Sequence, residues 1–462
     1  MQEIFDRKNE KQYTYIYLYS YVCRGGICVR RRAVAVLTCL LVFLCGCAVD
    51  VQSYLQPPRA QGQQQAVQAA LETAIGENGE DTPRYTLKYP VAGDILSAYI
   101  FLDGVGKQTS AQEAETAAIL YAPEGAKNTH IHLLRREQGG WRSLADLVGA
   151  GLEVDRVLLG DVDGDGMAEL LIGWSLYSTE RQLSAYRLDG KTAVESIGQY
   201  TACVTADLNA DGRDEVLLLR SDRSETMTAT LYTVENSAAK VLSATKLDPA
   251  IRGISRFLYG KTSDGGDALY IDAKSESGAL MTEIVAFRDG KLITPLHAAG
   301  QHSTVSTRVA KVAAMDADGN GVPEFPVTSR LAAYPNAFGE DTWQWLTEWY
   351  SWDMQTGEAE RQFAAIVNRT DGYFIEVEDQ WIATLTTRYD MKNGVLWLDM
   401  TTEDGAKPFL AVQAQREDAQ ASVDGYAFET LGSGSTLRIW YDDTAAYRLT
   451  PEKISYMLVT LS

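Results

Sequence analysis

Short apolar runs bounded by polar, glycine-containing turns recur along residues 90–365 and predict a mainly β fold. Three of them, ELLIGW from Glu169, EVLLL from Glu215 and EFPV from Glu324, follow directly on acidic loops. Uniformly apolar runs of this length are typical of strands that are buried on both faces. The loops therefore connect β-strands.

A second pattern accompanies these loops. Turns between two amphipathic runs predict β-hairpins about 28 residues after three of the loop positions. The turns lie at Asp189-Gly190, Asn236 and Asp289-Gly290. The acidic loops begin at 161, 207 and 316, a glycine-rich turn near 260 has the shape of a loop without acids in register, and a spread-out version begins at Asp103. A unit of loop, strand and hairpin repeated about every 50 residues predicts a β-propeller of about five blades.

The acidic loops have the spacing of a calcium site. Oxygen ligands at positions one, three and five, glycine at six, a backbone carbonyl at seven and a further acid suit a hard cation such as Ca²⁺. The predicted ligands are Asp161, Asp163, Asp165, Met167 and Glu169; Asp207, Asn209, Asp211, Arg213 and Glu215; and Asp316, Asp318, Asn320, Val322 and Glu324. Their last acid stands at position nine, and position twelve is apolar, which excludes an EF-hand. Solvated Asp-Gly turns are the alternative.

These DxDxDG loops resemble FG-GAP or VCBS-type repeats, which are related to the calcium-bearing blades of integrin α-subunit propellers. The resemblance covers residues 90–362 and implies up to three structural Ca²⁺ ions. Those propellers usually have seven blades, and the phenylalanine-glycine and glycine-alanine-proline signatures are not visible in this sequence. We expect a smaller propeller.

Residues 1–46 have the pattern of a leader and lipoprotein signal peptide, with 1–28 a possible start-site error. Arg30–Arg32 precede the apolar run AVAVLTCLLVFL, and Leu44-Cys45-Gly46-Cys47 resembles the bacterial lipobox, which implies lipidation of Cys47. The alternative interpretation is a transmembrane anchor, but the apolar run is shorter than the roughly 20 residues that a membrane span needs. This pattern predicts an exported protein that is anchored on the outer side of a bacterial membrane.

The remaining segments differ from the repeats. Residues 47–89 suggest a tether with a short helix at about 63–74, and residues 366–462 an α+β domain of alternating strands. Thr450 as N-cap and Pro451 at the first helical position predict a final helix through Leu461. The stretch DGYFIEVEDQW weakly resembles the start of PsbP-like domains.

Charge and cysteine content narrow the choice of partner. The formal net charge of −20 argues against nucleic acid. Behind Cys47 only Cys203 remains, so no disulfide framework is available and bound Ca²⁺ is the expected stabiliser.

No sequence motif of a known catalytic site is present, and no residue can be assigned a catalytic role. Trp343, Trp345 and Trp349 could form a ligand-binding surface, although their spacing favours a buried strand. His130 and His132 could share a metal, but surface histidines without a third ligand are favoured. We expect a non-enzymatic calcium-binding module at the bacterial cell surface that binds a glycan or a surface protein. A Ca²⁺-dependent polysaccharide hydrolase or lyase, and a propeller that only presents the C-terminal domain, are the alternatives.

Overall fold

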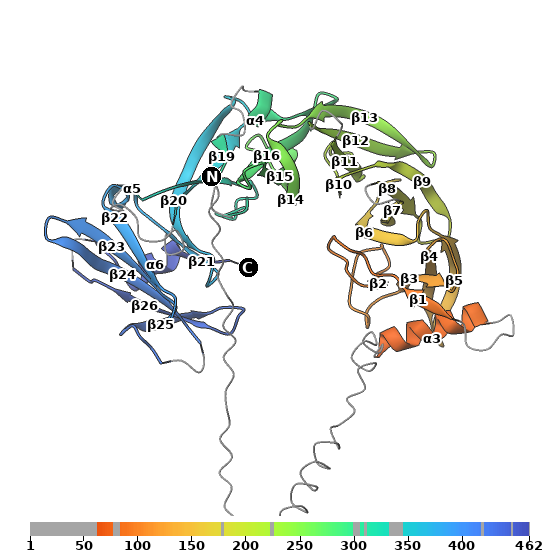
Figure 1. Ribbon diagram of the computed structural model, residues 1–462, viewed down its shortest axis with the longest axis horizontal. Coiled ribbons are helices and arrows are strands. Elements are labelled where there is room, and N and C mark those ends of the chain that lie inside the picture. Colours follow the sequence, from red (N-terminus) through yellow and green to blue (C-terminus); the bar gives the residue numbers. More distant parts are fainter. Residues whose placement is uncertain are drawn as a thin grey trace, which may run out of the picture. The chain divides into compact units, whose positions relative to one another are not determined.

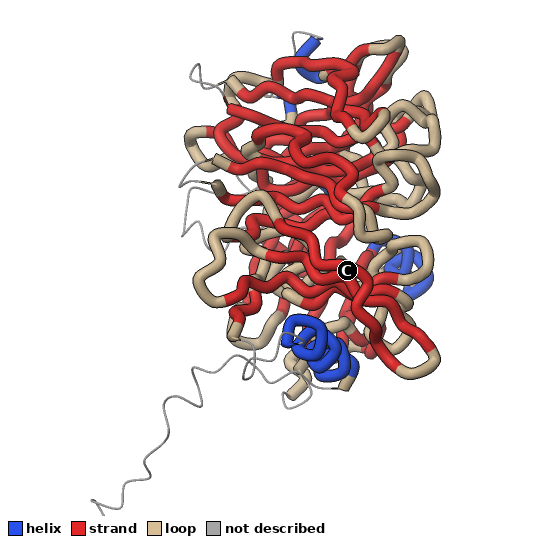
Figure 2. Tube along the Cα trace, turned by 90° about the vertical axis from the view of Figure 1, so that its right-hand side faces the viewer, coloured by secondary structure: helices blue, strands red, loops and turns tan. Residues whose placement is uncertain are grey.

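The computed structural model describes most of one compact unit, Gly62–Ser462. The residues described are 62–76, 84–176, 180–221, 226–298, 305–308, 312–331, 345–416, 420–444 and 447–461. The predicted signal peptide and Cys47 lie outside them. Strands predominate (Figure 2), which confirms a mainly β fold.

Three consecutive sheets repeat one antiparallel up-and-down order of four strands. The second sheet consists of β6 Glu153–Gly160, β7 Glu169–Ser175, β8 Arg181–Tyr186 and β9 Thr192–Gln199. The third consists of β10 Ala202–Ala206, β11 Glu215–Ser221, β12 Met227–Glu235 and β13 Ala238–Lys246. The fourth consists of β14 Ile251–Lys261, β15 Asp267–Ser275, β16 Leu280–Arg288 and β17 Lys291–Ile293. A four-stranded meander of this kind is the unit of a propeller blade.

The predicted hairpins connect the outer strands of these sheets. Asn236 and Ser237 have φ values of 53° and 59° between β12 and β13, and Asp289 and Gly290 have 49° and 75° between β16 and β17. Positive φ at both central residues is the conformation of the tight turn that matches strand twist. Asn and Asp tolerate it, which explains the sequence signal.

The first sheet is covered on one face by a helix. Its strands are β1 Tyr85–Leu87, β2 Tyr99–Leu102, β3 Thr116–Pro123, β4 His130–Glu137 and β5 Gly140–Val148. The helix α3 (Gln63–Gly76) confirms the short helix expected in this region. Its Val67 and Leu71 are completely buried in a cluster with Ile119 of β3 and Leu134 of β4.

The fifth and sixth sheets are larger. The fifth consists of β18 Phe325–Ser329, β19 Leu346–Asp353, β20 Glu358–Asn368, β21 Tyr373–Glu376 and β27 Leu458–Thr460. The sixth consists of β22 Leu385–Asp390, β23 Val395–Thr402, β24 Gly405–Gln415, β25 Tyr426–Thr430 and β26 Thr436–Tyr441. Short helices α4 (Pro295–Ala298), α5 (Asp379–Ile382) and α6 (Pro451–Met457) complete the described elements. No helix in the described ranges has the length and apolar character needed to cross a membrane.

The C-terminus differs from the predicted final helix. Thr450 does cap α6, since its Oγ1 accepts the N–H of Lys453 over 3.1 Å, but the helix ends at Met457 and a helix through Leu461 is wrong. The chain continues as β27, which pairs with β21. The domain boundary expected at residue 366 falls within β20.

Sheets that follow one another in the sequence share apolar clusters, and Figure 1 shows them in chain order from α3 to β26. Pairs of buried residues that represent the five clusters are Leu133 with Ile172, Leu183 with Leu218, Leu231 with Leu269, Tyr270 with Phe325, and Ile366 with Leu396. Every residue of β7 from Glu169 to Trp174 is buried, which confirms the interpretation of the ELLIGW run. Successive meanders packed through both faces make the fold propeller-like.

Candidate metal centres

The acidic loops occupy one position in three different sheets. The first connects β6 to β7, the second connects β10 to β11, and the third leads from a bridge at Met315 into β18. In each case the residue before the loop pairs with the glutamate at position nine: Gly160 with Glu169, Ala206 with Glu215, and Met315 with Glu324. The strands therefore bring both ends of each loop together.

The same four hydrogen bonds shape all three loops. The first residue accepts the N–H of the sixth over 2.9, 3.0 and 2.9 Å in Asp161–Gly166, Asp207–Gly212 and Asp316–Gly321. The third accepts the N–H of the fifth over 3.2, 2.7 and 3.0 Å in Asp163–Asp165, Asn209–Asp211 and Asp318–Asn320. The fifth accepts the N–H of the seventh over 2.9, 3.0 and 2.7 Å in Asp165–Met167, Asp211–Arg213 and Asn320–Val322. The ninth accepts the N–H of the second over 3.1, 2.9 and 2.8 Å in Glu169–Val162, Glu215–Leu208 and Glu324–Ala317.

This wrapping requires glycine at position six. Gly166, Gly212 and Gly321 have φ values of 86°, 87° and 86°, which side chains with a Cβ rarely adopt. The backbone bonds then orient the side chains so that one oxygen from each of three acids comes within 4.8 Å of the other two. The acids that meet in this way are Asp161, Asp163 and Glu169; Asp207, Asp211 and Glu215; and Asp316, Asp318 and Glu324.

The glutamate at position nine is the buried member of each group. Glu169, Glu215 and Glu324 are 2%, 1% and 0% exposed. Burial, followed among the raising causes by neighbouring aspartate charges, raises the pKa of Glu169 to about 8 and the pKa values of Glu215 and Glu324 to about 7. Glu324 Oε1 is buried without a hydrogen-bond partner. A hard cation would coordinate that oxygen and stabilise the ionised acids, so these oxygen donors fit Ca²⁺.

An arginine supplies positive charge at the first loop. Arg187 donates from Nη1 to Asp163 Oδ2 and from Nη2 to Asp165 Oδ2. At the other two loops, the amides of Asn209 and Asn320 contact the acids instead. A Ca²⁺ ion in the first loop must therefore compete with a guanidinium. Arg187 could not be predicted from the loop motif because it lies outside the loop, in the hairpin that follows. The only sequence feature that marks it is its position beside the Asp189-Gly190 turn.

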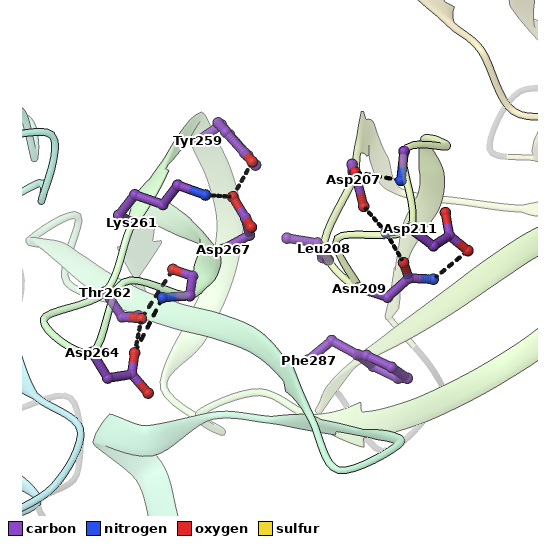
Figure 3. Close-up of polar contacts among 12 residues, drawn as sticks. Asp207, Leu208, Asn209, Asp211, Tyr259, Lys261, Thr262, Asp264, Asp267 and Phe287 are labelled. Atoms are coloured by element: carbon purple, nitrogen blue, oxygen red, sulfur yellow. Dashed lines mark hydrogen bonds and ion pairs between the residues drawn. The ribbon is translucent and has the colours of Figure 1, made fainter. Parts of the chain in front are cut away.

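The fourth sheet has a lysine beside its turn where the second, third and fifth sheets have an acidic loop (Figure 3). Lys261 pairs with Asp267 in the same register in which the residue before each acidic loop pairs with its glutamate. Lys261 Nζ lies 2.6 Å from Asp267 Oδ1, which also accepts the Tyr259 hydroxyl. Arg288 Nη2 lies 3.3 Å from Asp264 Oδ1. This turn therefore neutralises its acids without a metal.

Neighbouring loops contact one another. The bonds are Ala168 N to Val105 O at 3.0 Å, Asp161 N to Asp214 Oδ2 at 3.0 Å, Asp214 N to Asp161 O at 2.9 Å, and Lys261 N to Gly321 O at 3.0 Å. The turn at Asp103, the three acidic loops and the Lys261 turn thus lie along one side of successive sheets.

The tryptophans expected at a binding surface are only partly described. Trp349 is completely buried and stacks on Phe363 with ring centroids 5.9 Å apart, so it is unavailable to a ligand. Trp345 is half-buried, and Trp343 lies outside the described residues.

The two histidines of β4 share one carboxylate. His130 Nδ1 lies 2.7 Å from Asp146 Oδ2, and His132 Nδ1 lies 3.3 Å from Asp146 Oδ1. The expectation of surface histidines is wrong for His132, which is 2% exposed because Tyr121 and the neighbouring strands cover it. His130, His132 and Asp146 do not bring three ligand atoms together as the acidic loops do.

No protein-family model matches the chain, and no curated relative is found. Solved structures with partial similarity include a rhamnogalacturonan lyase from Bacillus licheniformis (14% identity, 74% of this chain and 85% of that chain, TM-score 0.29). An oligogalacturonate lyase from Vibrio parahaemolyticus has 11% identity over 74% of this chain and 88% of that chain, with a TM-score of 0.25. The protein Sqt1 from Saccharomyces cerevisiae has 10% identity over 71% and 73%, with a TM-score of 0.28. Likenesses this weak have no bearing on function.

Proposed function

We propose that this protein is a calcium-binding, propeller-like binding module. The observation that carries the proposal is the set of four hydrogen bonds that recurs in three loops of different sequence and leaves acidic oxygens together each time. Ca²⁺ would be structural, since the ion would neutralise charge that each loop alone holds unfavourably. The first five sheets would be the blades, and the sixth sheet with α5 and α6 the C-terminal domain.

The resemblance of Leu44–Cys47 to a lipobox supports an exported protein held on the outer side of a bacterial membrane by lipidated Cys47. Calcium is available there, and a rigid module on a tether of some 40 residues would reach beyond the lipid surface. A glycan or another surface protein is the proposed partner, and no residue is assigned a catalytic role.

The test is thermal unfolding during a Ca²⁺ titration of EDTA-stripped protein. At a hundred times its Kd, one filled site stabilises the folded state by roughly 2.7 kcal/mol, so we expect Tm to rise. The double variant Asp161→Ala, Asp163→Ala should lower Tm more in Ca²⁺ than in EDTA, where only the loop hydrogen bonds and the Arg187 ion pair are lost.

The Lys261 turn offers a matched control, because Asp264→Ala removes an acid from a loop that has its own cations. This variant should keep the full response to Ca²⁺. Equal losses of stability in Ca²⁺ and EDTA for the Asp161, Asp163 variant would contradict the metal assignment. Cleavage of polysaccharide by the calcium-loaded protein would instead favour a hydrolase or lyase.

A further inference from the structure

The sixth sheet carries a polar cleft of about 1020 Å³ that none of the acidic loops lines. The β22–β23 turn, the end of β24 and the β25–β26 turn meet at one end of this sheet, as their pairing registers require. The β20–β21 turn of the fifth sheet completes the lining. With residues 420–422, the cleft is therefore assembled from five segments of the C-terminal hundred residues.

The described lining of this cleft carries net positive charge, opposite in sign to the charge of the whole chain. Arg369, Lys392 and Arg416 line it, each from a different segment, in a protein with a net charge of −20. None of the three forms an ion pair within 4.0 Å with a described carboxylate. Among the described residues of the lining, the only acid is Asp371, whose Oδ2 already accepts the Asn368 amide at 2.7 Å and the hydroxyl of Tyr389 at 2.8 Å. Three cations that have no described carboxylate within 4.0 Å attract an anionic ligand.

A buried side chain holds the walls in place. Gln413 is 1% exposed, its Nε2 donates to the carbonyl of Asn393 over 3.1 Å, and its Oε1 accepts the N–H groups of Ser422 and Val423 over 2.9 and 3.2 Å. Gly394 has a φ of +63°, and a Cβ there would lie 3.0 Å from the carbonyl oxygen of Ala414. The cleft is thus preformed, which lowers the entropic cost of binding.

The lining determines the class of ligand. Its other polar side chains are hydroxyls and amides, which donate to and accept from sugar hydroxyls; they include Thr370, Asn393, Ser422, Ser433 and Ser435. Tyr389 and Leu431 add apolar surface of the kind on which a sugar ring packs. The volume is at the upper end of the range for small-molecule sites, far larger than a single small anion needs. Cations on three separate segments suit charges that are spaced along a chain.

We propose that this cleft binds an acidic oligosaccharide, with uronate carboxylates on Arg369, Lys392 and Arg416. Guanidinium groups pair with carboxylates in a bidentate manner, which makes the two arginines the stronger contacts. The inference rests on the proposed function only in treating the protein as a binding module, because no calcium-loop residue lines the cleft.

The test is titration calorimetry of the full chain, purified in detergent, at low salt and in EDTA. The probes are trigalacturonate, the neutral trisaccharide maltotriose, and inorganic phosphate. Trigalacturonate should bind at least tenfold more tightly than maltotriose, and phosphate should not displace it at equal concentration. Arg369→Gln, Lys392→Gln and Arg416→Gln should each weaken binding at least threefold.

Lys407→Gln is the matched control, since Lys407 is an exposed cation near the other end of β24, and it should leave binding unchanged. Absence of trigalacturonate binding at millimolar concentration, equal binding of maltotriose, or full displacement by phosphate would each overturn the proposal. Binding of trigalacturonate in EDTA together with no effect of Ca²⁺ on Tm would refute the calcium assignment alone. A rise of Tm with Ca²⁺ together with no binding of trigalacturonate would refute the cleft proposal alone.

Discussion

Glu169, Glu215 and Glu324 are the residues on which the acidic loops depend most, because each is buried while the aspartates of its loop remain at least partly exposed. A buried carboxylate beside other acids is unfavourable in its ionised form. Its backbone partner, the N–H of the second loop residue, compensates one oxygen. The other oxygen of Glu215 accepts the Asn209 amide, whereas that of Glu324 is buried without a partner. The loops therefore have an energetic reason to take up a cation that exposed Asp-Gly turns lack.

Arg187 should weaken Ca²⁺ binding at the first loop. Replacing it by glutamine removes the guanidinium from Asp163 and Asp165, so the affinity of this loop for Ca²⁺ should rise at least severalfold. The same change should lower Tm in EDTA, because two acids lose their counter-ion. Calorimetric titration with Ca²⁺ measures the affinity.

The control for this prediction is Arg142→Gln, which removes an exposed arginine that pairs with Glu137 at 3.2 Å. This control should change neither the affinity for Ca²⁺ nor the Tm in EDTA. An unaltered Ca²⁺ affinity in the Arg187 variant would mean that the guanidinium and the ion do not share the site.

Glu283 of β16 makes stability depend on pH. Burial, followed among the raising causes by the charge of Asp248, raises its pKa to about 8. The folded state therefore retains a proton that the unfolded chain loses above its ordinary pKa near 4.5, so stability falls as pH rises through this interval. In Glu283→Gln the stability relative to the unmodified protein should grow between pH 5 and 8, by up to about 1.4 kcal/mol per pH unit.

Denaturant unfolding at a series of pH values measures this difference, with Glu276→Gln, an exposed acid in the preceding turn, as the control. A difference that stays constant across the interval would show that Glu283 is ionised in the folded state.

Elements with strong local signals could be predicted from the sequence, and those set by distant contacts could not. The hairpins at Asn236 and Asp289 follow from residues that tolerate positive φ. The start of α6 follows from Thr450 and Pro451. Its end does not, because Leu458–Thr460 are drawn into pairing with β21, some 80 residues earlier.

The site divides in the same way. Each acidic loop is a continuous segment whose spacing encodes its geometry, so the acids that it brings together could be named from the sequence. Arg187 reaches the first loop from the next hairpin, and the basic cleft collects residues between 369 and 435. Only the paired sheets bring such residues together.

Removing the cap of α6 should cost about 1 kcal/mol of stability. The Thr450 hydroxyl accepts the N–H of Lys453, which Thr450→Ala leaves without this partner at the first turn. Urea unfolding measures the loss, and Ser455→Ala, a change within the same helix that keeps the cap, should cost less. Equal stability of Thr450→Ala and the unmodified protein would show that α6 is held by its packing alone.

At the scale of the whole molecule, each described sheet is stabilised by apolar contact with the next, so damage should remain largely within the affected pair. Ending the chain after Met457 removes β27 and the buried Leu458, and should cost at least about 2 kcal/mol. Hydrogen exchange should accelerate in β20 and β21 and remain slow in the second and third sheets.

Tyr456→Ala, which removes a side chain that is 76% exposed, is the control and should leave exchange unchanged. Protection of β21 that survives the truncation would show that β27 adds nothing to the fifth sheet.

The pairing of β27 with β21 also has a consequence for biosynthesis. β27 follows β21 by some 80 residues in the chain, so β21 has no partner on that side until this whole stretch has been synthesised. The first four sheets can form in order as they appear, but the fifth stays incomplete while the strands of the sixth emerge. The sixth sheet, although its strands come later in the sequence, can therefore be complete before the fifth.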